Sequence, residues 1–205
     1  PRLCSSAASD VYKRQVINTA KASEEDSVAI VGLGGVGLSA LLASIAIGSK
    51  KTIAIDLSDE KLALAKELGA NHTLNPKDEN FLETFLDITS GGANIAVETA
   101  GSGHALKTAY DITRRGGTTV AAGMPGPKVE ITLSHLSIAA EERVIKGSYM
   151  GSCIAQRDIP KYLDMFQTGK LPVDRLLSRK IKFEDLNEAM DRLDDAKTVR
   201  EVLIP

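Results

Sequence analysis

The chain has 205 residues with 43% hydrophobic and 25% charged side chains, a balance typical of a globular protein that can bury one α/β core, or one core and part of a second. The formal net charge of −2 excludes the strongly basic surface that binds nucleic acid or an anionic membrane. The longest apolar stretch, residues 28–48, is interrupted by the four glycines of one turn, so we expect a strand, a turn and a helix there and no membrane span.

The first fifteen residues, PRLCSSAASDVYKRQ, differ in character from the rest of the chain. They lack the apolar core of a signal peptide and the periodicity of a helix or a strand. The string SAASDVYKRQ within them resembles translated sequencing-adapter sequence. We therefore expect residues 1–15 to be a non-native leader and give them no part in the fold.

Beyond the leader, short runs rich in β-branched residues alternate with longer amphipathic stretches, which is the pattern of βαβ units in a parallel sheet. The predicted strands are residues 27–31, 52–56, 72–75, 94–98, 118–123 and 144–149. The predicted helices between them are residues 36–47, 59–68, 79–89, 105–114 and 134–141. Ser58 is placed to cap the second helix, and Gly69 to end it. Six strands predict a doubly wound α/β sheet over residues 16–151.

The regular alternation stops after Tyr149. We predict a helix at 159–168, a strand at 176–181, a helix at 183–193 and a last strand at 199–204. Asp158 and Pro160 are residue types found in the first turn of a helix, so they indicate where the first of these helices begins. We interpret residues 152–205 as a separate, incomplete segment.

A glycine-rich motif, Gly32-Leu33-Gly34-Gly35-Val36-Gly37, directly follows the first predicted strand and opens a helix. In the G-x-G-x-x-G pattern, Gly32 permits a tight turn, Gly34 lets the backbone approach a pyrophosphate, and Gly37 allows the helix to pack closely on the strand. The N–H groups at the start of such a helix bind phosphate, assisted by the helix dipole. The motif therefore predicts a Rossmann-type dinucleotide site.

Asp56 ends the second strand about 20 residues after the last glycine, the spacing at which a carboxylate accepts hydrogen bonds from the adenosine ribose. The same carboxylate would repel the 2′-phosphate of NADP, and no arginine follows it closely. We therefore favour NAD over NADP. The alternative interpretation is that Asp56 only caps the helix that begins near Ser58.

Four segments in order carry a resemblance to a known family, VINTAK at 16–21, GLGGVG at 32–37, IDLSDEKLALAKELGA at 55–70 and VREVL at 199–203. With them the chain resembles the C-terminal part of the zinc-containing medium-chain alcohol dehydrogenases, most of all the class III-like group. The match runs from about residue 16 to the end and corresponds to the second half of a family member. The resemblance implies an NAD-dependent enzyme in which zinc polarises an alcohol that gives a hydride to the nicotinamide.

The resemblance also implies cofactor contacts at the matching positions. The pyrophosphate would be lined by Gly32, Gly34, Gly35, Val36 and Gly37, with Arg200 reaching it from the last strand. The ribose would meet Asp56 and Lys61, and the adenine side Thr99 and Ala100. The nicotinamide end would meet Ala122, Gly123, Met124, Tyr149 and Met150. Arg200 has a second interpretation as a solvated strand charge.

The sequence departs from the family pattern because the catalytic domain with its zinc ligands is absent. The last catalytic zinc cysteine of the family would fall near Ala7, and Cys4 is out of register with it. His72, His104 and His135 lie on different predicted elements and are interpreted as structural. Catalytic zinc needs three protein ligands. We therefore expect no catalytic residue and no metal site in this chain, and zinc only in the full-length parent enzyme.

Three alternatives stay open beside this function. A zinc-independent medium-chain reductase, such as a quinone reductase, shares the cofactor motif. A methyltransferase also combines a glycine-rich turn with an acidic residue after its second strand, but the third glycine and VREVL favour the dehydrogenase. A non-catalytic nucleotide-binding module would need no residues beyond those present.

The expected partners are an alcohol or aldehyde in the full enzyme and a second copy of the chain, with no nucleic acid and no membrane. The strand at 144–149 would form the sheet edge, and family dimers pair these edges into one continuous sheet. The two cysteines, Cys4 and Cys153, are too far apart for a CxxC pair and suit a reducing compartment, so we expect the cytoplasm.

Overall fold

The computed structural model describes residues 15–149, 152, 154–194 and 199–204. Its main element is a parallel sheet of six strands in the order β3-β2-β1-β4-β5-β6. The strands are β1 (Ser27–Val31), β2 (Lys51–Ile55), β3 (His72–Leu74), β4 (Ala93–Glu98), β5 (Thr113–Ala121) and β6 (Val144–Gly147). The order reverses between β1 and β4, which is the topology of a doubly wound Rossmann sheet and confirms the predicted fold class.

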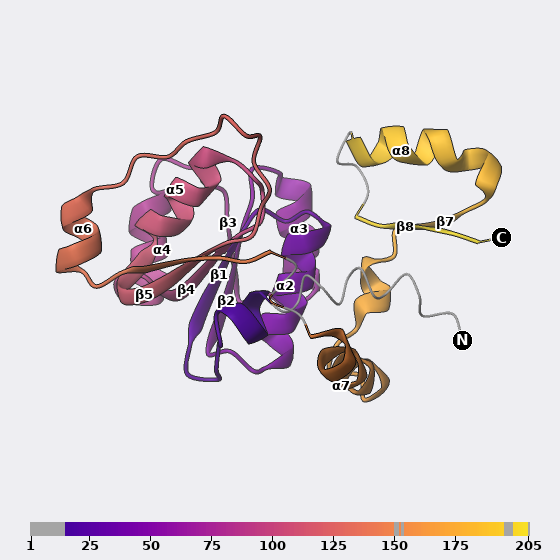
Figure 1. Cartoon of the computed structure of the whole chain (residues 1–205), viewed down its shortest axis with the longest axis horizontal. Helices are drawn as coiled ribbons and strands as arrows, with labels where there is room; N and C mark the ends of the chain where they lie inside the picture. Colours follow the sequence, from indigo (N-terminus) through magenta and orange to yellow (C-terminus); the bar gives the residue numbers. More distant parts are fainter. Residues whose placement is uncertain (1–14, 150–151, 153, 195–198, 205) are drawn as a thin grey trace.

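Helices cover both faces of the sheet, with α2 and α3 on one side and α4 and α5 on the other (Figure 1). Their bounds are α2 (Gly35–Ala46), α3 (Asp59–Glu67), α4 (Phe81–Thr89) and α5 (Gly103–Asp111), and the short α6 (His135–Ala140) precedes β6. Because both faces are covered, β1 is buried along its whole length. Among the described residues, no helix combines the length and apolarity needed to cross a lipid bilayer.

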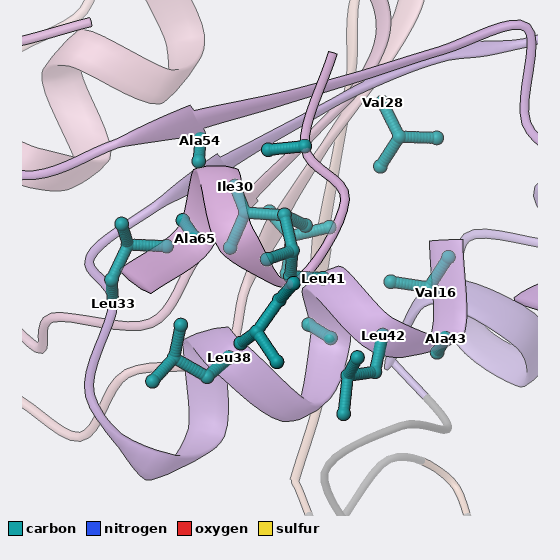
Figure 2. Close-up of a cluster of buried hydrophobic side chains, with 14 of the residues drawn as sticks. Val16, Val28, Ile30, Leu33, Leu38, Leu41, Leu42, Ala43, Ala54 and Ala65 are labelled. Atoms are coloured by element: carbon teal, nitrogen blue, oxygen red, sulfur yellow. The ribbon is translucent and has the colours of Figure 1, made fainter. Parts of the chain in front are cut away.

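Two clusters of buried side chains fill the two faces, and alternate residues of β1 contribute to each. Val28 and Ile30 pack with Leu38 of α2 in the first cluster, part of which Figure 2 shows. Ala29, which points to the opposite face, packs in the second cluster with Phe85 of α4. This alternation follows from the two-residue period of a strand. It fixes the register of β1 between the two helical layers.

The predicted helix signals are confirmed at α3. The Ser58 hydroxyl accepts a hydrogen bond from the Lys61 N–H at 3.4 Å, which satisfies one of the free donors of the first turn. Gly69 follows the last turn with a φ of +111°, a conformation that glycine adopts without strain. The start of α3 is therefore fixed directly after the end of β2.

Four strands end earlier than the sequence predicted, β2 and β3 by one residue each and β5 and β6 by two. β5 stops at Ala121 rather than 123, because the N–H groups of Ala122 and Gly123 both turn to the Glu98 carbonyl at 2.9 and 3.0 Å. The predicted edge strand at 144–149 is corrected to Val144–Gly147, since Gly147 pairs with Ala121, the last residue of its neighbouring strand. Tyr149 therefore lies beyond the strand and is exposed.

Helix α7 (Ala155–Gln167) starts earlier than predicted, so that Pro160 lies inside it rather than at its first position. The reason is a tertiary contact that local sequence does not reveal. The buried carboxylate of Asp158 accepts the N–H of Ile154, the residue before the helix, and the side-chain amide of Asn18, both at 3.0 Å. These bonds hold the additional first turn of α7 against the N-terminal segment.

The C-terminal elements form a small unit beside the main sheet (Figure 1). They are the 3-10 helices η3 (Val173–Leu176) and η4 (Phe183–Asp185), α8 (Leu186–Asp194), and the parallel pair β7 (Arg179–Ile181) and β8 (Glu201–Leu203). The predicted helix at 183–193 is thus divided between η4 and α8. Tyr162, Leu171 and Leu176 are buried in the first core cluster and join this part of the chain to the sheet domain.

The chain enters the fold through a π-helix, η1 (Gln15–Thr19), which the sequence did not predict. Val16 is fully buried and packs in the first core cluster near Leu42 and Ala43 of α2 (Figure 2). The Thr19 hydroxyl bonds that of Ser148 at 2.9 Å. Of the predicted leader, residues 1–14 lie outside the described residues, whereas Gln15 is buried in η1.

Candidate functional site

The glycine motif forms a tight turn between β1 and α2. Gly32 has a φ of +93°, and a Cβ there would lie 2.8 Å from the Cβ of Ala100. A Cβ on Gly37 would lie 1.8 Å from the Gly32 carbonyl oxygen. The Thr99 hydroxyl donates to that same oxygen at 2.6 Å. These contacts confirm the conformational roles expected of Gly32 and Gly37.

The N-terminus of α2 offers the donors that an anion needs. Gly34 precedes the helix and has no side chain to accept the free N–H groups of the first turn. A Cβ at Gly34 would meet no protein atom within 4 Å, so this side of the turn is open. The positive end of a twelve-residue helix therefore faces space that a phosphate group can approach closely.

Asp56, directly after β2, is oriented by two backbone donors. Its Oδ2 accepts the Leu33 N–H at 2.6 Å and its Oδ1 accepts the Ser58 N–H at 2.9 Å. The cap of α3 is the Ser58 hydroxyl, so Asp56 is not that helix's side-chain cap. A carboxylate oxygen accepts more than one hydrogen bond. Asp56 thus keeps acceptor capacity for two neighbouring hydroxyls of a ligand.

A cavity of about 600 Å³ opens at the carboxyl ends of β1 and β2. It brings together four predicted residues, Gly32, Asp56, Lys61 and Ala100. Its other lining residues are Val31, Ile55, Leu57, Ser58, Pro76, Ser102, His104, Ala105 and Thr108. The volume lies within the range of small-molecule sites, and the wall is largely apolar with a few convergent polar groups. The sequence did not indicate the wall formed by α5, because only the tertiary packing places it opposite Asp56.

Of the residues predicted for the nicotinamide end, the four that the structure describes do not line this cavity. Met124 and Tyr149 are exposed, at 75% and 73%. A Cβ on Gly123 would lie 2.1 Å from the Gly101 nitrogen, so the loops after β4 and β5 touch there. Met150 lies outside the described residues.

A buried carboxylate that the sequence analysis missed connects those two loops. Glu98, the last residue of β4, is only 2% exposed, and its Oε1 accepts the Gly101 N–H at 2.6 Å. Its backbone carbonyl binds the start of the loop after β5. The available signal was a charged residue at the end of an apolar strand, NIAVE. Glu98 fixes the shape of the loop that contains Ala100.

The last strand approaches the glycine turn from the C-terminal unit. The Val199 carbonyl oxygen would lie 3.3 Å from a Cβ at Gly35. Arg200, the next residue, is half-buried. The structure therefore brings the segment that carries Arg200 to the N-terminus of α2, although the two are far apart in the sequence.

The described residues contain no group of three His, Cys, Asp or Glu side chains that could hold a metal ion. His72, His104 and His135 lie on or beside β3, α5 and α6 respectively. Partial burial, together with the charges of Lys51 and Lys66, lowers the pKa of His72. The residues that the structure describes therefore do not fit a zinc site.

Residues 35–168 match the family described as zinc-binding dehydrogenases. The chain is 34% identical over 189 residues to a geraniol dehydrogenase of Castellaniella defragrans, and 33% identical over 191 residues to the alcohol dehydrogenase class-2 isozyme 2 of Oryctolagus cuniculus. Both alignments cover 92% of this chain but 50% of the relative, so the chain spans about half the length of the curated relatives it matches. The crystal structure of benzyl alcohol dehydrogenase from Acinetobacter calcoaceticus matches with a TM-score of 0.91 at 30% identity, over 96% of this chain and 54% of that one.

Proposed function

Because this chain belongs to the zinc-binding dehydrogenase family, we propose that it is the NAD(H)-binding part of an alcohol dehydrogenase. The observation that carries the proposal is the Asp56 carboxylate, which lines the cavity and is oriented by the N–H groups of Leu33 and Ser58. A carboxylate held in this way can accept hydrogen bonds from both hydroxyls of a ribose. The open N-terminus of α2 beside it provides N–H donors for a pyrophosphate.

In this proposal the adenosine lies in the cavity between α3 and α5, and the rest of the dinucleotide follows the carboxyl ends of the strands toward β5 and β6. The pyrophosphate contacts Gly32, Gly34, Gly35, Val36, Gly37 and Arg200. The ribose contacts Asp56 and Lys61, and the adenine side contacts Thr99 and Ala100. The nicotinamide end contacts Ala122, Gly123, Met124, Tyr149 and Met150. The family relationship and the shared cavity position of Gly32, Asp56, Lys61 and Ala100 support these assignments.

The same geometry supports NAD rather than NADP as the ligand. Both Asp56 oxygens already accept backbone N–H groups, so the carboxylate has little freedom to turn away from the ribose 2′ position. A 2′-phosphate placed there would bring a second negative charge close to this carboxylate. Lys61 lines the same cavity, but its single ammonium would also be attracted to Asp56.

The proposed reaction of the parent enzyme is hydride transfer between an alcohol and NAD, with an aldehyde as the product of a primary alcohol. Bound NAD supplies the hydride acceptor. The residues of this chain bind and orient the dinucleotide, and the loop shaped by Glu98 fixes the position of Ala100. We propose no catalytic residue in this chain and a catalytic zinc only in the full-length parent enzyme, since the described residues do not fit a zinc site.

A second copy of the chain is the proposed partner at the sheet edge. Val144 and Ile145 of β6 are each 40% exposed, and among the described strands β6 pairs with β5 alone. Pairing two such edges would cover their free N–H and C=O groups. The cytoplasm is the proposed compartment, because a chain with two cysteines among 205 residues suits a reducing environment.

The test is a calorimetric titration of the full chain with NADH and NADPH, repeated on Asp56→Ala and Asp56→Asn. We expect NADH to bind more tightly than NADPH. Loss of hydrogen bonds to a charged group corresponds to a roughly 10- to 100-fold weaker NADH affinity for Asp56→Ala. Asp56→Asn keeps one acceptor oxygen but no charge. It should therefore weaken NADH binding less than Asp56→Ala does, and it should reduce the difference in affinity between NADH and NADPH.

The matched control is Asp111→Asn, which removes an exposed carboxylate that pairs with Lys107 at the far end of α5. It should leave both affinities unchanged. Absence of NADH binding by the folded wild-type chain, or equal losses in Asp111→Asn and Asp56→Asn, would contradict the proposed function.

A further inference from the structure

The segment that carries Arg200 is tied to the sheet domain through η3. Leu176 is 2% exposed and belongs to the first core cluster. The guanidinium of Arg175 donates to the Glu67 carbonyl at the end of α3, at 3.0 Å. The Leu177 N–H turns back to the Asp174 carbonyl at 3.0 Å. Ser178 therefore follows a stretch whose position is set by the core.

Ser178 makes three hydrogen bonds to two consecutive residues of the final segment. Its hydroxyl oxygen accepts the N–H of Val199 at 3.0 Å and the N–H of Arg200 at 3.3 Å. Its own N–H donates to the Arg200 carbonyl at 2.8 Å. The N–H and the carbonyl of Arg200 belong to the two peptide planes that flank its Cα, so the bonds from Ser178 to both of them fix these two planes. The direction in which the Arg200 side chain leaves the backbone is set by these contacts.

Two further contacts hold the same segment from either side. Val199 packs against the first core cluster, and its carbonyl approaches the site of a Gly35 Cβ within 3.3 Å. On the other side, the Glu201 carboxylate receives two hydrogen bonds from the Arg192 guanidinium of α8, both at 2.8 Å. Arg200 thus stands between two anchored neighbours, beside the N-terminus of α2.

We propose that Ser178 is a positioning residue for the cofactor site, whose hydroxyl holds the Val199–Arg200 segment so that the Arg200 guanidinium meets the pyrophosphate of the dinucleotide. This inference rests on the proposed function. Guanidinium binding to phosphate oxygens is directional, because two parallel N–H donors must align with two oxygens. Loss of the anchor therefore weakens the phosphate contact even though Ser178 touches no ligand atom.

The experiment measures the affinities of the full chain for NADH and for adenosine. The wild type is compared with three single variants, Ser178→Ala, Ser178→Thr and Arg200→Gln, and with the double variant that combines Ser178→Ala and Arg200→Gln. Adenosine has no phosphate, so it reports on the Asp56 side of the cavity alone. We expect Ser178→Ala to weaken NADH about fivefold, the effect of losing a hydrogen bond of ordinary strength, and to leave adenosine unchanged. Ser178→Thr keeps the hydroxyl at an exposed position and should bind NADH like the wild type.

A double-mutant cycle separates positioning from general destabilisation. If Ser178 acts through Arg200, then Ser178→Ala has no further effect on NADH affinity once Arg200 is Gln. The matched control is Ser134→Ala, which also removes an exposed hydroxyl that accepts a backbone N–H, at the start of α6. It should leave NADH affinity unchanged.

Distinct results would overturn the two ideas separately. If Arg200→Gln weakens NADH binding and Ser178→Ala does not, Ser178 is not a positioning residue. The same holds if the losses of NADH binding free energy in the two single variants add up in the double variant. In both cases the proposed function stands. An equal loss of adenosine and NADH affinity in Ser178→Ala would also overturn the inference, because the effect would not be confined to the phosphates. If the folded wild-type chain shows no measurable binding of adenosine or NADH, the proposed function is wrong. The proposed role of Ser178 is then wrong as well, because it rests on that function.

Discussion

Replacing Gly37 by alanine tests whether the glycine turn is held by backbone contact. The new Cβ would lie 1.8 Å from the Gly32 carbonyl oxygen and 2.8 Å from the Thr99 hydroxyl. Even close carbon–oxygen contacts are about 3.3 Å long, so α2 and the turn would have to separate by about 1.5 Å. The closest clash is with a backbone atom, the Gly32 carbonyl oxygen, so no change of side-chain rotamer can relieve it.

Overpacking typically costs about 1–3 kcal/mol, and a backbone overlap of this size places Gly37→Ala at the upper end, at about 3 kcal/mol. For a chain of this size each kcal/mol lowers the melting temperature by about 2–4 °C, so we expect a decrease of roughly 6–12 °C. Thermal unfolding followed by circular dichroism measures the shift, and titration of the same variant with NADH measures the loss of binding that accompanies a displaced turn.

Gly34→Ala is the matched control within the same motif. A Cβ at Gly34 meets no atom within 4 Å, and φ is −72°, so the substitution is not strained in the free protein. Its stability should change by less than about 1 kcal/mol, since a poorer N-cap and a less flexible unfolded chain act in opposite directions. NADH binding should nevertheless fall, because the methyl group would occupy the space proposed for the pyrophosphate. Equal decreases in melting temperature for the two variants would refute this reasoning.

Substitutions at three other residues test contacts away from the turn. Hydrogen bonds from Arg157, the Ile154 N–H and Asn18 hold the pKa of Asp158 at about 2, so Asp158 stabilises the fold above about pH 4 and this contribution is lost as the pH falls toward 2. The difference in melting temperature between wild type and Asp158→Asn should therefore shrink as the pH falls over that interval. A difference that stays constant would contradict this prediction. Glu98→Ala leaves the part-buried Gly101 N–H without its acceptor and should lower the free energy of unfolding in urea by about 1–3 kcal/mol. Glu98→Gln, which keeps an acceptor oxygen, should lower it less. Phe85→Ala empties a fully buried position and should cost about 3–5 kcal/mol in the same assay, and a cost below about 1 kcal/mol would mean that α4 is loosely packed.

Features with a local signal could be predicted from the sequence. The turn at Gly32 and Gly37 is defined by a six-residue motif, and the cap at Ser58 by its neighbours along one helix. The alternation of strand and helix was enough to predict a doubly wound sheet, because few other arrangements cover both faces of a parallel sheet. The family resemblance is confirmed by the match over residues 35–168. The cofactor contacts stay predictions until binding is measured.

The errors have tertiary causes. β6 ends at Gly147 because its partner strand ends, and α7 begins early because Asp158 reaches Asn18, which lies on η1. Glu98 and Ser178 were missed for the same reason, since each acts on a loop or segment that the fold brings close. Such contacts leave no periodic pattern in the sequence.

The approach of Val199 to Gly35 has a consequence for the order in which the site forms. The two residues are separated by most of this chain, so the proposed phosphate site cannot be complete until synthesis has passed residue 199. The six-stranded sheet and the cavity proposed for adenosine are formed by residues before 150 and can assemble sooner. A nascent chain at that stage would present the proposed nucleoside cavity without the segment that we propose binds the pyrophosphate.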